Sequence, residues 1–105
     1  MLVEVAARIR EAVRIEDVVA RWGGEEFLVV LPSTDIDGAW LLGDRIRMAI
    51  AAQPVGFTTG SIGVTVSVGC ASSRTNETGD AIVSRADDAL YEAKEAGRDR
   101  TVRAS

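Results

Sequence analysis

The sequence contains no histidine and one cysteine, and these absences narrow its chemistry. Mechanisms with a histidine base are excluded, as are the usual nitrogen and sulfur ligand sets for zinc. Any metal must therefore be held by oxygen atoms, which predicts magnesium, with manganese as a substitute. The lone Cys70 has no partner for an internal disulfide, and its position in an apolar run predicts a small buried side chain.

Long hydrophobic runs are also absent from the 105 residues. No segment approaches membrane-spanning length, and the first residues lack the basic region and long apolar stretch of a signal peptide. We therefore expect one soluble, cytoplasmic domain with a single core and no membrane contact through this segment. The formal net charge of −4 opposes association with nucleic acid polymers, so any phosphate binding must be local.

Apolar residues recur at helical spacing in three segments. We expect helices over residues 1–13, about 35–52 and about 80–96, with Asp35 or Asp37 as the cap of the second and Gly97 as the C-terminal cap of the third. No capping residue precedes the first helix, so we expect the chain to be cut from a longer protein.

Alternating, β-branched segments predict the strands. We expect strands at residues 17–20 and 27–31, one or two strands over 57–71, and a short strand at 101–102. The order of elements predicts the α+β class, with helices on both faces of one largely antiparallel sheet.

Gly23 and Gly24 separate the first two strand segments, and Glu25 and Glu26 follow them. A glycine pair in this position predicts a β-hairpin with a two-residue turn of the primed types, which needs positive φ. Adjacent carboxylates repel, so a divalent cation carrying phosphates is the natural partner. The alternative is that both acids only solvate the tip of the hairpin.

The run from Gly23 to Phe27 resembles the signature of GGDEF domains, the diguanylate cyclases that condense two GTP molecules into cyclic di-GMP and release pyrophosphate in bacterial signalling. Three further blocks follow the family's order. Residues 14–17 (RIED) resemble its RxxD product-inhibitory site, residues 65–71 its central strand and residues 86–98 its last helix.

The resemblance implies that Glu25 is a magnesium ligand and the proton acceptor, and that Glu26 makes a second acidic contact to the metal. It also implies that the substrate nucleotide approaches the backbone at Gly23 and Gly24. Neighbouring residues in a strand face opposite sides, so both acids share one metal only if the turn twists one of them round. We therefore rank Glu25 ahead of Glu26 as the metal ligand.

Lys94 and Arg98 correspond to the residues that hold the β- and γ-phosphates of GTP in the family. Spaced four apart, they are expected on one face of the last helix. The alternative is that they complement the negative end of the helix dipole.

Arg14 and Asp17 correspond to the product-inhibitory site, and Arg45 completes it from the same or a neighbouring subunit. A guanidinium fork suits a guanine edge or a phosphate, and a carboxylate suits the guanine N–H donors. The alternative is a solvated charge pair in a loop. For Trp22 and Trp40 we expect packing rather than base stacking.

The resemblance covers nearly the whole chain, yet residues 1–105 match only the C-terminal two thirds of the family's domain. The first strand with its metal aspartate, the first helix and the guanine-recognition residues have no counterpart. We therefore expect a single partial domain that is inactive alone. An exposed sheet edge and an apolar helix face favour a homodimer or a domain-exchanged oligomer.

The sequence is compatible with three functions. The first is a cyclase domain that binds GTP, and the second is a non-catalytic regulatory module that binds cyclic di-GMP through Arg14 and Asp17. The third is a dimerisation segment that binds no guanine nucleotide.

Overall fold

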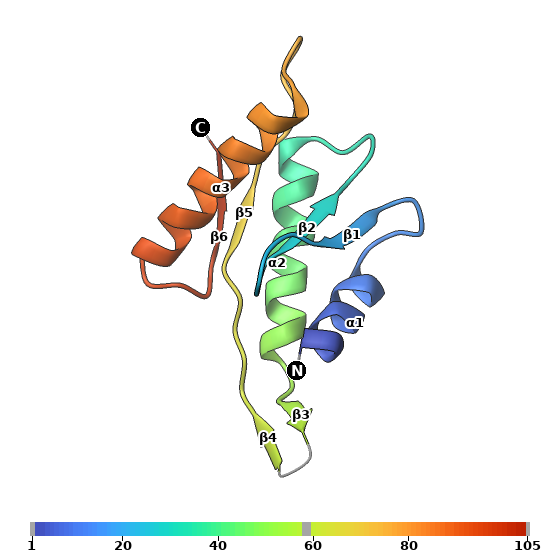
Figure 1. Cartoon of the computed structure of the whole chain (residues 1–105), viewed down its shortest axis with the longest axis vertical. Coiled ribbons are helices and arrows are strands. Elements are labelled where there is room, and N and C mark those ends of the chain that lie inside the picture. Colours follow the sequence, from blue (N-terminus) through green and yellow to red (C-terminus); the bar gives the residue numbers. More distant parts are fainter. Residues whose placement is uncertain (1, 58–59, 105) are drawn as a thin grey trace.

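The computed structural model describes residues 2–57 and 60–104, and helix α2 (Ile36–Ala51) runs through its middle (Figure 1). Helix α1 (Leu2–Ala12) packs on α2 on one side, while α3 (Gly79–Glu95) lies on the other side with the last two strands (Figure 1). All three predicted helices are confirmed; the first predicted residue, Met1, lies outside the described part.

The six described strands form three two-stranded sheets. Strand β1 (Val18–Arg21) pairs with β2 (Phe27–Val30) and β3 (Val55–Phe57) with β4 (Gly60–Ile62), both antiparallel. Strand β5 (Val68–Cys70) runs parallel to β6 (Thr101–Arg103).

The α+β class and the predominance of antiparallel pairs are as expected, but the single sheet is not. Within residues 2–57 and 60–104 no ladder joins one strand pair to another. The strands are only three or four residues long, and β5 and β6 pack on α2 and α3. The segment expected to hold one or two strands contains β4 and β5, and β3 begins just before it; Thr58 and Thr59 lie outside the described residues.

Local side chains set the helix ends. The Asp35 carboxylate accepts a hydrogen bond from the Gly38 amide at 2.8 Å, so Asp35 rather than Asp37 is the N-cap of α2. Thr78 caps α3 in the same way through Ala81.

Helix α3 ends in a Schellman motif, which confirms Gly97 as its C-terminal cap. Gly97 has φ +120°, its amide donates to the Lys94 carbonyl, and the Arg98 amide donates to the Ala93 carbonyl at 2.9 Å. This motif turns the chain sharply toward β6.

One apolar core joins α1, α2, β1 and β3. Its buried members are Val5, Ile9, Val19, Ile46, Ile50 and Val55. Full burial of such a side chain contributes about 1.5–3 kcal/mol, so this cluster fixes α1 and the β1–β2 hairpin on α2.

A second contact region joins β5 to α3. A Cβ at Gly69 would collide with the Ala86 carbonyl and the Leu90 backbone, so only glycine permits this approach. Neighbouring Cys70 is buried as predicted, and burial raises the pKa of its thiol. None of the described helices combines the length and apolarity needed to cross a bilayer.

Candidate functional site

The β1–β2 hairpin carries two candidate sites at its opposite ends. The segment from Arg14 to Asp17 directly precedes β1, and the signature loop joins β1 to β2. The core side chain Val19 holds the strand between them on the body of the protein.

The signature loop is wider than the sequence predicts. Strand register pairs Arg21 with Phe27, and the Trp22 amide donates to the Glu26 carbonyl at 2.9 Å. Five residues therefore separate the strands, and neither Gly23 nor Gly24 has positive φ. The expected two-residue primed turn is wrong, because a loop of this length reverses the chain without left-handed residues.

Glu25 is exposed and Glu26 is half-buried at the tip of this hairpin. Neither carboxylate has a hydrogen bond or an ion pair with any residue that the structure describes. The described residues also contain no group of three or more acidic, histidine or cysteine side chains arranged for a metal. Two carboxylates would supply only part of the ligand set of a magnesium ion, which would keep water and phosphate oxygens as its further ligands.

Arg21 supports the loop, a role that the sequence did not indicate. Its Nη2 donates to the Gly24 carbonyl at 2.6 Å, and its guanidinium lies 6.0 Å from the centroid of the Phe27 ring. It therefore contacts the chain on both sides of the acid pair. Side chains alternate along β1, so Arg21 lies on the same face as Val19. This alternation is the sequence pattern from which the role of Arg21 could have been predicted.

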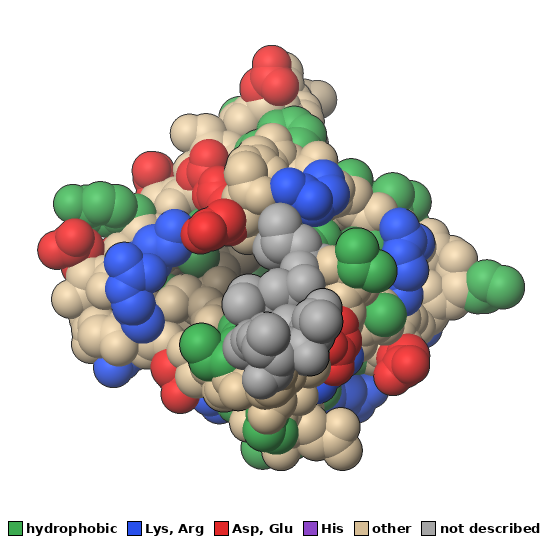
Figure 2. Space-filling model, turned by 60° about the horizontal axis from the view of Figure 1, so that its bottom comes forward, with side chains coloured by type: hydrophobic (Ala, Val, Ile, Leu, Met, Phe, Trp, Pro, Cys, Tyr) green, Lys and Arg blue, Asp and Glu red, His purple; other side chains and the backbone are tan. Residues whose placement is uncertain are grey.

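An open cavity of about 380 Å³ lies beside Arg21, between α1 and β1. Its lining residues are Val3, Ala6, Ala7, Arg10 and Arg21. The two arginines give a mostly apolar surface a local positive charge next to the signature loop. Elsewhere, acidic and basic side chains are interspersed on the face seen in Figure 2.

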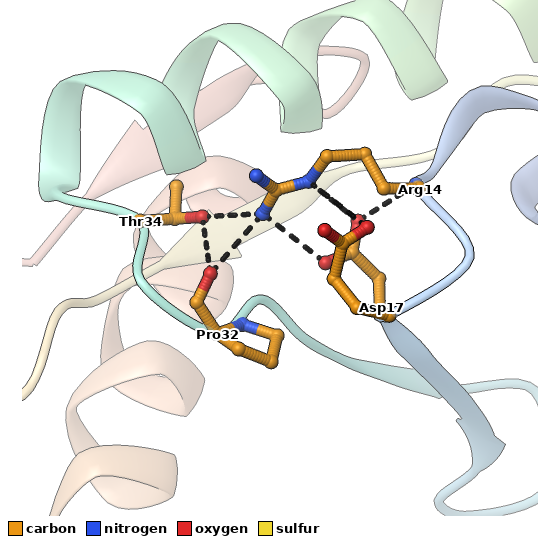
Figure 3. A network of polar contacts seen from close by, with 5 residues as sticks. Arg14, Asp17, Pro32 and Thr34 are labelled. Atoms are coloured by element: carbon orange, nitrogen blue, oxygen red, sulfur yellow. Dashed lines mark hydrogen bonds and ion pairs between the residues drawn. The ribbon is translucent and has the colours of Figure 1, made fainter.

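At the other end of the hairpin, Arg14 and Asp17 form a closed network with Pro32 and Thr34 (Figure 3). Arg14 Nη2 donates to Asp17 Oδ1 at 3.2 Å, to the Pro32 carbonyl at 3.2 Å and to Thr34 Oγ1 at 2.7 Å. The Arg14 amide and Nε both donate to Asp17 Oδ2, at 2.8 and 3.4 Å. The Arg14 side chain is half-exposed, whereas that of Asp17 has 0% exposure.

This network lowers the pKa of the Asp17 carboxyl. Desolvation alone would raise the pKa of Asp17, but the hydrogen bonds from the Arg14 amide and guanidinium, together with its charge, outweigh desolvation. Asp17 is therefore ionised and faces Arg14 rather than solvent.

Arg45 lies apart from this network. It is exposed on α2, and no hydrogen bond or ion pair in the described part of the chain joins it to Arg14 or Asp17. Its place in the site stays a prediction.

The two tryptophans differ. Trp40 donates from Nε1 to the Thr101 carbonyl at 3.1 Å and has the Arg103 guanidinium 5.6 Å from its ring, which confirms a packing role. Trp22 is 54% exposed beside the signature loop, so the packing prediction for it is wrong.

The predicted pairing of Lys94 and Arg98 on one helix face is also wrong. Lys94 lies in the last turn of α3, whereas Arg98 follows the helix with φ 65°. The Schellman motif at Gly97 redirects the chain before the fourth residue is reached. Arg47 on α2 pairs with Asp99 at 3.0 Å and so holds the segment that presents Arg98.

Residues 1–100 match the family described as diguanylate cyclase, GGDEF domain. The chain belongs to the GGDEF family. The diguanylate cyclase DgcP of Pseudomonas aeruginosa is 46% identical to this GGDEF domain over 96 residues, which are 91% of this chain and 14% of that protein.

Solved structures support the same assignment. Diguanylate cyclase SiaD from Pseudomonas aeruginosa, solved with its activator SiaC, superposes with a TM-score of 0.91 at 42% identity over 98% of this chain and 40% of that one. The coiled coil and GGDEF domain of DgcB from Caulobacter crescentus, in complex with c-di-GMP, gives 0.90 at 27% identity over 98% and 56%. The chain thus spans only a small share of the length of the diguanylate cyclase DgcP.

Proposed function

We propose that this GGDEF domain is the catalytic part of a diguanylate cyclase that condenses two GTP molecules into cyclic di-GMP. The observation that carries the proposal is the signature loop, which turns Glu25 out to solvent without any partner in the described part of the chain. An unpaired carboxylate beside a second one suits a phosphate-bound cation better than a structural role.

The chain's own residues have distinct roles in this reaction. The 3′-hydroxyl oxygen of one GTP forms a bond to the α-phosphorus of the other, the bond to pyrophosphate breaks, and the proton passes to the Glu25 carboxylate. Glu25 and Glu26 would hold magnesium, which neutralises phosphate charge. Gly23 and Gly24 leave the backbone accessible, since a Cβ at Gly24 would meet nothing within 4 Å.

Lys94 and Arg98 supply the positive charge for the β- and γ-phosphates. Both side chains are exposed, with Lys94 in the last turn of α3 and Arg98 directly after the turn at Gly97. Arg98 is directed by the left-handed backbone and by the neighbouring Arg47–Asp99 ion pair, so this site depends on the C-terminal turn.

We further propose that this chain alone is inactive. Two carboxylates at the loop leave the metal without a third acidic ligand in the residues that the structure describes. The test is incubation of the purified chain with GTP and magnesium, followed by chromatographic separation of the nucleotides. We expect no cyclic di-GMP; its formation would overturn the proposed inactivity and establish the reaction.

The metal assignment has a separate test by calorimetry. Glu25→Ala is expected to abolish magnesium-dependent GTP binding, because it removes the exposed carboxylate. The matched control is Glu11→Ala, since Glu11 is an exposed acid on α1 with no described hydrogen bond. Equal GTP affinity in the wild type and Glu25→Ala would contradict the assignment.

A second candidate function is binding of cyclic di-GMP at Arg14 and Asp17. The observation in its favour is a half-exposed guanidinium already joined to a carboxylate at the base of the signature hairpin. We expect Arg14→Ala to abolish binding of cyclic di-GMP in calorimetry. Arg100→Ala is the charge-matched control, because Arg100 is exposed and, among the residues that the structure describes, its guanidinium hydrogen-bonds only the Arg98 carbonyl.

We also propose a homodimer or exchanged oligomer, located in the cytoplasm where GTP is available. Its support is an exposed apolar pair on the hairpin: Val18 and Val30 are cross-strand neighbours and are 54% and 49% exposed. A monomer at all micromolar concentrations, in size-exclusion chromatography with light scattering, would contradict the oligomer.

A further inference from the structure

The Arg14 network links the two open ends of the signature hairpin. Arg14 and Asp17 precede β1, whereas Pro32 and Thr34 follow β2, and the Arg14 guanidinium joins the two segments (Figure 3). One nitrogen, Nη2, carries the contacts to Asp17 Oδ1, the Pro32 carbonyl and Thr34 Oγ1.

This arrangement hides the carboxylate that a ligand would need. The Asp17 side chain has 0% exposure, and both its oxygens accept hydrogen bonds from Arg14. A ligand that donates to Asp17 must first move Arg14 away from that carboxylate, whereas the guanidinium itself is already half-exposed. The observed state is therefore a closed form of the site.

We propose that Thr34 is an autoinhibitory residue of this site, whose hydroxyl holds Arg14 in the closed pair with Asp17 until a guanine dinucleotide displaces it. The proposal rests on the proposed binding of cyclic di-GMP at Arg14 and Asp17. Thr34 provides the only side chain outside the RxxD segment that hydrogen-bonds Arg14 among the described residues, and its bond of 2.7 Å is the shortest that the guanidinium makes.

The position of the Thr34 side chain is set independently of Arg14. Its hydroxyl also donates to the Pro32 carbonyl at 3.0 Å, and its methyl group would lie 2.9 Å from a Cβ placed at Gly38. The methyl group is therefore packed against the start of α2 while the hydroxyl points at Arg14. A β-branched side chain held in this way has little rotamer freedom, so it holds Arg14 in place.

Removal of the hydroxyl shifts the balance toward the open form. The apparent affinity of the site is proportional to the fraction of molecules in the open, binding-competent form. A contact that is made only in the closed form lowers this fraction and therefore weakens binding. A hydrogen bond of this kind corresponds to about a two- to tenfold change in an equilibrium constant.

The test is calorimetric titration of the full chain with cyclic di-GMP. Thr34→Val keeps the packed methyl group and removes the hydroxyl, and we expect it to bind about two- to tenfold more tightly than the wild type. Thr34→Ser keeps the hydroxyl but loses the methyl group that orients it, and we expect an affinity closer to that of the wild type than to that of Thr34→Val. Weaker or unchanged binding by Thr34→Val would overturn the autoinhibitory role.

Arg14→Ala separates this proposal from the proposed function. If Arg14→Ala binds as tightly as the wild type, or if no variant binds, the product site itself is wrong and the proposal falls with it. If Arg14→Ala loses binding while Thr34→Val matches the wild type, only the role of Thr34 is wrong.

A readout without ligand checks the closed state directly. In proton–nitrogen NMR spectra, the Arg14 Nε–H should exchange slowly with solvent in the wild type and in Thr34→Ser, and faster in Thr34→Val. Equal exchange rates in all three would show that Thr34 does not hold the guanidinium, even where the variants fold alike by circular dichroism.

Discussion

The two ends of the β1–β2 hairpin handle acidic side chains in opposite ways. At the base, Asp17 is enclosed and accepts hydrogen bonds from one arginine. At the tip, Glu25 is exposed and has no partner in the described part of the chain. The same strand thus separates a carboxylate satisfied within the fold from one that needs a partner from outside.

The difference indicates which end is built to bind without rearrangement. The tip presents the Glu25 carboxylate directly, and the loop around it is restrained by the Arg21 contact to the Gly24 carbonyl and the hydrogen bond from the Trp22 amide to the Glu26 carbonyl. The base has to open before Asp17 meets a ligand. An exposed carboxylate and an enclosed, hydrogen-bonded one should therefore respond differently to mutation.

The largest expected effect comes from removing the support that both ends share. Ile50 has 0% exposure and belongs to the core cluster with Val19 of β1. Ile50→Ala should lower the free energy of unfolding by about 2–5 kcal/mol, because it removes buried contacts and leaves a cavity. Urea denaturation measures this, and both GTP and cyclic di-GMP binding should weaken together.

Met48→Ala is the matched control for the core substitution. Met48 lies on the same helix and is 59% exposed, so its replacement should change stability by less than about 0.5 kcal/mol. Similar losses in both variants would mean that the core beneath the hairpin does not hold its two ends.

Sequence patterns predicted the parts of this comparison that depend on neighbours along the chain. The helices follow from apolar spacing, and Asp35 and Gly97 mark helix ends because capping is local. The antiparallel pairing of β1 with β2 was predicted, because a hairpin is local, but the division of the strands into three separate pairs was missed, since it depends on packing between distant segments. The Thr34–Arg14 contact spans 20 positions along the chain, so no local pattern could reveal it.

In the candidate sites too, local sequence predicted the position of the residues but not their geometry. The signature loop was located from Gly23 and Gly24, but its width depends on the register of Arg21 with Phe27. The separation of Lys94 from Arg98 depends on three-dimensional turn geometry that the four-residue spacing conceals.

Removing one carboxylate at each end of the hairpin should affect the stability of the fold differently. Asp17→Asn should lower the urea midpoint, because it removes the negative charge that holds the Arg14 guanidinium. Glu25→Gln should change the free energy of unfolding by less than about 0.5 kcal/mol, since Glu25 has no described partner to lose. An equal fall in both variants would mean that the tip is as closed as the base.

The smallest expected effect is on the pH dependence of stability. Acid should weaken the closed end, where the pKa of Asp17 is lowered, and also the loop before α3, where hydrogen bonds from Arg85 lower the pKa of Glu77 from its usual 4.5 to about 2. A carboxylate with a lowered pKa contributes stability that is present above its unfolded pKa and is lost as the pH falls through its folded pKa.

The contribution of Glu77 should therefore be complete above about pH 4.5 and should disappear toward pH 2. Urea midpoints over this range should fall more steeply for the wild type than for Glu77→Gln, which cannot form the ion pair with Arg85 at any pH. Asp17→Asn should flatten the curve in the same direction, because it removes a carboxylate whose folded-state partner links its protonation to unfolding. Parallel curves for Asp17→Asn and the wild type would show that the Arg14–Asp17 pair contributes no stability to the base of the hairpin, and the contrast between its two ends would then be one of accessibility alone.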